Sequence, residues 1–139
     1  NMTEATSINA YVATEPLRLT IAEQIEAYLQ EAETASPKGL TQREMFFQRF
    51  RRDGFTYNMD SVLPRFAELE LEGIVRKSSR TRVSGDGYPG LVWRWVAPEN
   101  RAVQRRKAIA AKLKSARADV RQAKARVQTL TRMKAAAWA

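Results

Sequence analysis

The chain has 139 residues, with 24 Lys and Arg, 15 Asp and Glu, no Cys and no His, and a formal net charge of +9. The absence of Cys excludes disulfides and thiolate metal sites and fits a reducing cytoplasm, where we expect the protein. The absence of His removes the commonest general base and the commonest zinc ligand, so we expect no enzyme, no metal site and no cofactor. No apolar run reaches the roughly 18 residues of a membrane span, and no signal peptide is expected.

The positive charge is concentrated in the last third of the chain. Residues 101–134 carry twelve Lys or Arg and one acid, a net charge of +11, whereas residues 1–100 carry twelve bases and fourteen acids, a net charge of −2. A cationic segment of this density attracts polyanions. The sequence therefore predicts three parts: a flexible N-terminal arm over residues 1–16, a folded domain over 17–98, and a basic C-terminal helix over 99–139.

Two helices are expected in the first half of the folded domain. Apolar residues on one face from Ile21 to Leu29 predict a first helix over about residues 21–35. The spacing of Thr41 and Glu44 is that of a capping box, which predicts a second helix running to about Arg52. Gly54 can adopt a positive φ and is expected to end that helix.

A third helix and a β-hairpin follow. Asn58 is placed to cap a helix over about residues 59–72, with Val62, Phe66 and Leu69 as its buried stripe. After Gly73 the apolar period changes, which predicts a strand over 74–83, a glycine-rich tip over 84–90 and a second strand over 91–96. Trp93 and Trp95 are two residues apart in the second strand and so lie on the same face, and we expect both to be core residues.

An apolar series runs through the basic helix in alternating steps of four and three residues, which is the spacing of a heptad repeat. This pattern predicts a coiled coil between two copies of the chain, parallel or antiparallel. Alanine at several positions makes the expected interface thin. The members of this heptad series are Ile109, Leu113, Ala116, Val120, Ala123, Val127 and Leu130.

The stretch from Ser61 to Lys77 reads Ser-Val-Leu-Pro-Arg-Phe-Ala-Glu-Leu-Glu-Leu-Glu-Gly-Ile-Val-Arg-Lys. Together with residues 39–45 upstream, it resembles the winged helix-turn-helix family, and it is most similar to bacterial transcription regulators of the multiple-antibiotic-resistance type. The resemblance covers about residues 20–97. It implies a mainly α fold with a small β-hairpin, in which a winged helix-turn-helix domain precedes the long coiled-coil helix.

The resemblance also implies how DNA is bound: the N-terminus of the third helix lies in the major groove and the hairpin, or wing, lies against the neighbouring backbone. Arg65 then reads DNA, or it pairs with Glu68 or Glu72 along its own helix. Asn58 is a helix cap, a base contact, or both. The DNA-binding residues implied in this way are Tyr57, Asn58, Ser61, Arg65, Lys77, Arg80 and Arg82.

These features predict a cytoplasmic, dimeric protein that binds double-stranded DNA as a bacterial or phage transcriptional regulator. The alternative is a winged-helix assembly protein, such as a phage replication or packaging component, whose contact with nucleic acid is nonspecific. RNA binding through the arginine-rich helix is a third possibility.

Overall fold

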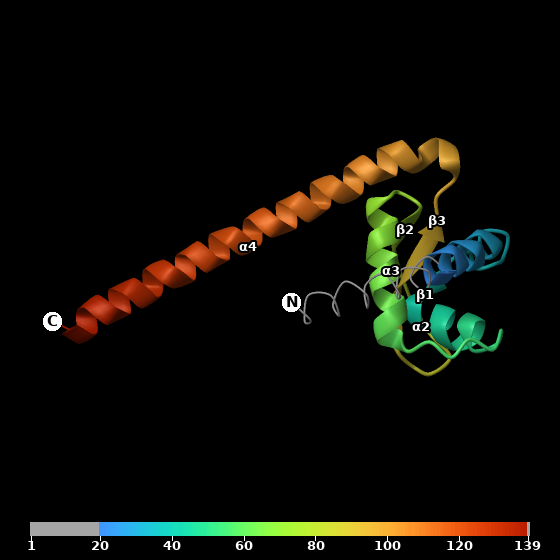
Figure 1. Cartoon of the computed structure of the whole chain (residues 1–139), viewed down its shortest axis with the longest axis horizontal. Helices are drawn as coiled ribbons and strands as arrows, with labels where there is room; N and C mark the ends of the chain where they lie inside the picture. The colour runs from blue at the N-terminus through green and yellow to red at the C-terminus, as the bar shows by residue number, and fades with distance from the viewer. Residues whose placement is uncertain (1–19, 139) are drawn as a thin grey trace, which may run out of the picture. The chain divides into compact units, whose positions relative to one another are not determined.

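The computed structural model describes residues 20–138 (Figure 1), so the arm predicted for residues 1–16 lies outside the described part. The described chain is mainly helical, with a small three-stranded antiparallel sheet and a long C-terminal helix. It divides after Arg105 into two compact units, which are considered separately below. None of the helices in residues 20–138 combines the length and the apolar character needed to cross a bilayer.

The first helix covers residues 20–32 of the described chain and ends three residues earlier than the sequence predicts. Residues 33–34 form a turn, and the amide of Gly39 returns to the carbonyl oxygen of Ala32 at 3.2 Å. The chain therefore reverses before Pro37 instead of continuing the helix. The predicted apolar face is confirmed, because Ile21, Ile25 and Leu29 are buried.

The second helical segment begins as predicted and then departs from regular α geometry. Thr41 caps helix α2 (Gln42–Glu44), and both bonds of the capping box are present. The chain continues as a π-helix, η1 (Met45–Phe50), with the amide of Arg51 bonded to the carbonyl of Phe46. In a π-helix residues five apart are hydrogen-bonded. This spacing lets Met45 and Phe50 both be buried.

Helix α3 (Met59–Leu71) agrees with the sequence prediction to within a residue. The side chain of Asn58 accepts a hydrogen bond from the Ser61 amide, and Val62, Phe66 and Leu69 are buried. Gly73 follows with a φ of +78°, which side-chain-bearing residues rarely adopt. A side chain there would also collide with the backbone of Arg101, so this turn requires glycine on two grounds.

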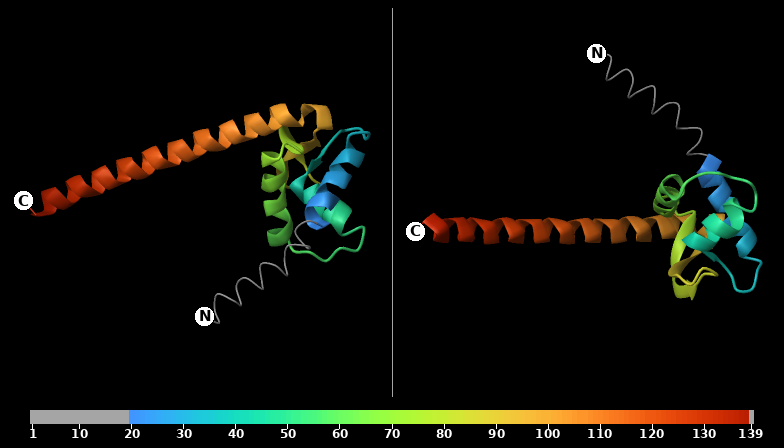
Figure 2. Two further views of the ribbon diagram at one scale, coloured as in Figure 1. Left: turned by 45° about the horizontal axis from the view of Figure 1, so that its top comes forward. Right: turned by 90° about the horizontal axis from the view of Figure 1, so that it is seen from below.

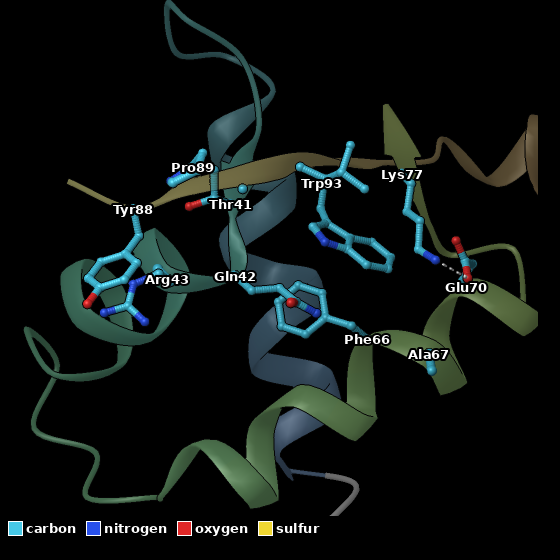
Figure 3. A pocket seen from close by; sticks show the side chains of 12 residues that line it. Thr41, Gln42, Arg43, Phe66, Ala67, Glu70, Lys77, Tyr88, Pro89 and Trp93 are labelled. Carbon is cyan, nitrogen blue, oxygen red and sulfur yellow. Dashed lines mark ion pairs between the residues drawn. The ribbon is translucent and has the colours of Figure 1, made fainter. Parts of the chain in front are cut away.

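The sheet has three strands in the order β1-β3-β2, which corrects the two-stranded hairpin predicted from the sequence. Strand β1 (Leu40–Thr41) pairs with β3 (Pro89–Trp95), and β3 pairs with β2 (Val75–Val83). On the face toward α3, the centroids of the Phe66 and Trp93 rings lie 5.1 Å apart. Figure 3 shows Trp93 extending from β3 toward the Phe66 ring. Trp93 is buried and Trp95 is partly buried against the core, as predicted.

The C-terminal helix α4 runs without interruption from Arg101 to Trp138, after a single 3-10 turn, η2 (Pro98–Asn100), and both views in Figure 2 show one continuous rod. At about 1.5 Å per residue, its 38 residues extend for about 57 Å. Its first turn belongs to the folded unit, where Arg101 donates to the Val96 carbonyl at 3.0 Å and to Glu26 at 2.9 Å.

Candidate nucleic-acid interface

The start of helix α3 is occupied by contacts within the protein. The Asn58 Oδ1 atom accepts hydrogen bonds from the Ser61 amide at 2.9 Å and from the Ser61 hydroxyl at 3.0 Å. Tyr57 stacks on Phe55 with ring centroids 5.4 Å apart and also contacts Phe50. Asn58 therefore acts as a helix cap, and Tyr57, in the segment that leads into α3, belongs to an aromatic cluster with Phe50 and Phe55.

Arg65 is directed along its own helix. Its Nη2 atom lies 3.3 Å from Glu68 Oε1, and only 12% of its side chain is exposed. The sequence left open whether Arg65 reads DNA or pairs with an acid of its own helix, and the structure shows the ion pair with Glu68. The residues of α3 and its C-cap include four acids and one base, so the segment from Met59 to Glu72 has a net charge of −3. Three of the four acids lie in its C-terminal half, and the segment as a whole offers a phosphate backbone no net positive charge.

The three wing bases predicted to contact DNA have different environments. Lys77 Nζ lies 3.8 Å from Glu70 Oε1, the ion pair that the dashed line in Figure 3 marks, and it also lies over the Trp93 ring. The Arg82 guanidinium donates to both carboxylate oxygens of Glu44, at 2.7 and 3.1 Å, and to the Gly39 carbonyl at 2.8 Å. Arg82 thus ties the wing to the start of α2, and its contact with DNA stays a prediction. Arg80 is exposed.

The Arg82 contact is also reflected in the ionisation of its partner. Burial by itself would raise the pKa of Glu44, but hydrogen bonds from Arg82 and from the Thr41 backbone outweigh it and lower the pKa below its ordinary value. The carboxylate is therefore charged at neutral pH and serves both the capping box and the wing.

The tip of the wing is held against the second helical segment by Arg43. This guanidinium donates to Asp86 and lies 4.3 Å from the centre of the Tyr88 ring. The bonds from Arg43 and Ser84 lower the pKa of Asp86 to about 2. Beside them a groove of about 490 Å³ runs between α3 and the wing (Figure 3). Glu70 and Lys77 both line this groove and form an ion pair, so the positive charge of Lys77 is balanced there by the carboxylate of Glu70.

The opposite face of the sheet carries a larger and more basic groove of about 700 Å³, which we call the basic groove. Arg76 and Arg94 are directly opposite each other in the β2–β3 register and so share a face, while Lys77 and Trp93 share the face toward α3. None of the residues that line the groove is acidic. Its basic members are Lys38, Arg76, Arg80, Arg82 and Arg94, and its hydroxyl members are Ser36, Ser78, Ser79 and Thr81.

An ion pair fixes one wall of the basic groove. Arg94 donates to the two carboxylate oxygens of Glu33 at 2.5 and 2.7 Å, which joins β3 to the turn after the first helix. The bond from Arg94 lowers the pKa of Glu33, and the same bond raises the pKa of Arg94. Lys38, Arg76 and Arg94 are not among the DNA-binding residues predicted from the sequence. The strand register brings Arg76 opposite Arg94, and this pairing has no local signal in the sequence.

In helix α4 the heptad series is exposed in the single chain. The exposed fractions are 44% for Ile109, 50% for Leu113, 52% for Val120 and 62% for Val127. None of the helix residues is buried. An apolar series with this exposure is available to a partner helix, and the basic side chains between its members are available to polyanions.

No family model matches this chain, and no curated protein matches it in sequence. Within residues 20–138 there is also no group of three or more acidic residues arranged to hold a metal ion.

Proposed function

We propose that this protein is a non-catalytic, DNA-binding protein whose affinity comes mainly from contacts to phosphates. The observation that carries the proposal is helix α4: one uninterrupted helix on which twelve bases and a single acid lie between residues 101 and 134. Each base that neutralises a phosphate releases condensed counterions from the duplex, and this release supplies most sequence-independent affinity. The exposed Arg80 on the wing adds a further contact from the folded unit.

The topology of the folded unit supports a winged helix-turn-helix assignment. Its order is helix, short strand, helix, helix and two long strands, with the last strand between the other two. The position of α3 after the capped second segment agrees with the place that the sequence resemblance gives to a recognition helix. On this assignment the protein acts as a transcriptional regulator, with α3 presented to the major groove.

The charge of α3 favours a second candidate, an assembly protein that contacts DNA without reading its sequence. A net charge of −3 over Met59–Glu72 and the pairing of Arg65 with Glu68 both disfavour insertion into the major groove. In this case α4 and the wing supply all of the DNA affinity, and the folded unit serves as a docking module within a replication or packaging complex.

The exposed heptad series supports a dimer under either candidate. Two α4 helices that bury these apolar side chains against each other remove them from water. Because the charged residues that flank the series are four bases and one acid (Lys112, Arg117, Lys124 and Arg126, with Asp119), the pair repels itself at low salt, and phosphates between the helices relieve that repulsion.

Binding to a selected and a random duplex separates the two candidates. DNA fragments bound from a random pool are sequenced, and the affinity of the wild type and of Arg65→Ala is then measured for one enriched and one scrambled 30-base-pair duplex. A regulator enriches a motif and loses more affinity for it than for the scrambled duplex when Arg65 is removed. An assembly protein binds both duplexes alike and enriches no motif. Absence of duplex binding at low salt would contradict DNA binding itself.

A further inference from the structure

The basic groove on the sheet face away from α3 has an unbalanced charge. Of its five basic side chains, Arg82 is paired with Glu44 and Arg94 with Glu33. Within residues 20–138, no ion pair is made by the other three, Lys38, Arg76 and Arg80, although Lys38 lies close enough to Glu33 for its charge to help lower the pKa of that carboxyl. The groove therefore presents three bases outside its two ion pairs, next to four hydroxyl side chains.

The strand register makes this imbalance costly for the protein alone. Arg76 and Arg94 are directly opposite across the β2–β3 pair, and like charges at such positions destabilise a sheet. Glu33 pairs with Arg94 and relieves part of this repulsion, whereas Arg76 makes no ion pair within the described chain. An anion bound beside Arg76 removes that repulsion.

We propose that the basic groove binds the phosphate backbone of duplex DNA. This inference rests on the proposed function and assigns to Lys38 and Arg76 a contact with DNA from the face of the sheet opposite α3. The two ion pairs build the groove before any ligand arrives, because Arg82 fixes β2 to the start of α2 and Arg94 fixes β3 to the turn after the first helix.

The arrangement of the free bases favours a polymer over a compact anion. Arg76 and Arg80 are four residues apart on β2, a separation of at most about 13 Å at about 3.3 Å per residue, and the irregularity between Lys77 and Thr81 shortens it. One strand of a duplex carries a phosphate for about every 3.4 Å of helix axis, so two bases spaced in this way can contact different phosphates of one strand. A single phosphate group would require bases that converge on one point.

The lining also favours a duplex over a single strand. No aromatic side chain lines the basic groove, whereas sites for single-stranded nucleic acid use aromatic platforms on which bases stack. Guanidinium, ammonium and hydroxyl groups suit the phosphates of a backbone whose bases remain paired.

The test measures the affinity of the full chain for a 30-base-pair duplex over a salt series. The double variant Lys38→Ala with Arg76→Ala is compared with Arg51→Ala with Arg52→Ala. The Arg51 and Arg52 variant is the control, because it also removes two positive charges but does so in an exposed turn that does not line the groove. Each lost phosphate contact reduces the slope of log affinity against log salt by about 0.9. We expect a slope less steep by about 1.8 in the groove variant and an unchanged slope in the control.

An unchanged slope in the groove variant, or equal changes in both variants, overturns the inference while leaving DNA binding by α4 intact. Failure of the wild type to bind duplex refutes the proposed function instead. If the double variant does not fold, Lys38→Ala alone, on an exposed residue, is expected to reduce the slope by about 0.9. Displacement of the duplex by about 1 mM inorganic pyrophosphate at constant ionic strength indicates a compact-anion site and also overturns the inference.

Discussion

The turn at Gly73 gives a stability prediction whose magnitude follows from the geometry. Gly73→Ala forces a side-chain-bearing residue into a φ of +78°, which costs about 1–2 kcal/mol. The new Cβ would also press on the Arg101 carbonyl and lie 3.0 Å from the Arg105 amide nitrogen, both backbone atoms. Overpacking of this kind costs about 1–3 kcal/mol. The expected loss of unfolding free energy is therefore about 2–5 kcal/mol.

Gly54→Ala is the matched control, because Gly54 has a φ of +80° but open space around its Cβ position. It should lose only the conformational cost of about 1–2 kcal/mol. Alanine also reduces the entropy of the unfolded chain, but that effect is common to both variants and cancels in their difference. Urea unfolding followed by circular dichroism measures both losses. If the two variants lose equal stability, the first turn of α4 does not pack on the turn after α3, and the reasoning is refuted.

Two further predictions concern acid stability and assembly. Because the folded pKa of Glu44 is lowered, its carboxylate stabilises the fold above its ordinary pKa of 4.5, and this stabilisation is lost as the pH falls through the lower folded value. The thermal midpoint should fall on acidification below about pH 4.5, and Glu44→Gln should flatten that fall; a midpoint independent of pH in the wild type would argue against the pairing. Val120→Glu places a charge within the heptad series at a cost of several kcal/mol and should convert a dimer to a monomer in sedimentation, whereas Arg121→Glu, one step away, should remain dimeric. A dimeric Val120→Glu would mean that the interface lies elsewhere.

Much of the helical framework could be predicted from local signals in the sequence. The Thr41 capping box, the Asn58 cap and the stop at Gly73 are each confirmed, because a cap or a positive φ depends on residues only a few positions apart. The predicted buried stripe of α3 is also confirmed, because the spacing of its apolar residues follows the 3.6-residue period of a helix and can be recognised within a short segment.

The features that were missed depend on contacts between distant residues. Strand β1 has only two residues and is defined by its pairing with β3. A segment this short has no alternation of apolar and polar residues from which it could be predicted. The pairing of Arg82 with Glu44, which is 38 positions away, has no local signal in the sequence. The basic groove likewise depends on strand register and on the pairing of Arg94 with Glu33, 61 positions away. Charge alone could not distinguish a base held by an ion pair from one that is free.

The most direct measurement of the central claim is the salt dependence of duplex binding by the full chain and by a variant with four neutralised bases in α4. Lys107→Gln, Lys114→Gln, Arg121→Gln and Arg132→Gln lie away from the heptad series on a helix that is continuous over these positions, and Gln retains good helix propensity. The wild type should bind a 30-base-pair duplex with a steep negative slope of log affinity against log salt, and the variant slope should be less steep by up to about 3.6. A flat response in the wild type, or equal slopes for the two proteins, would contradict phosphate binding by α4.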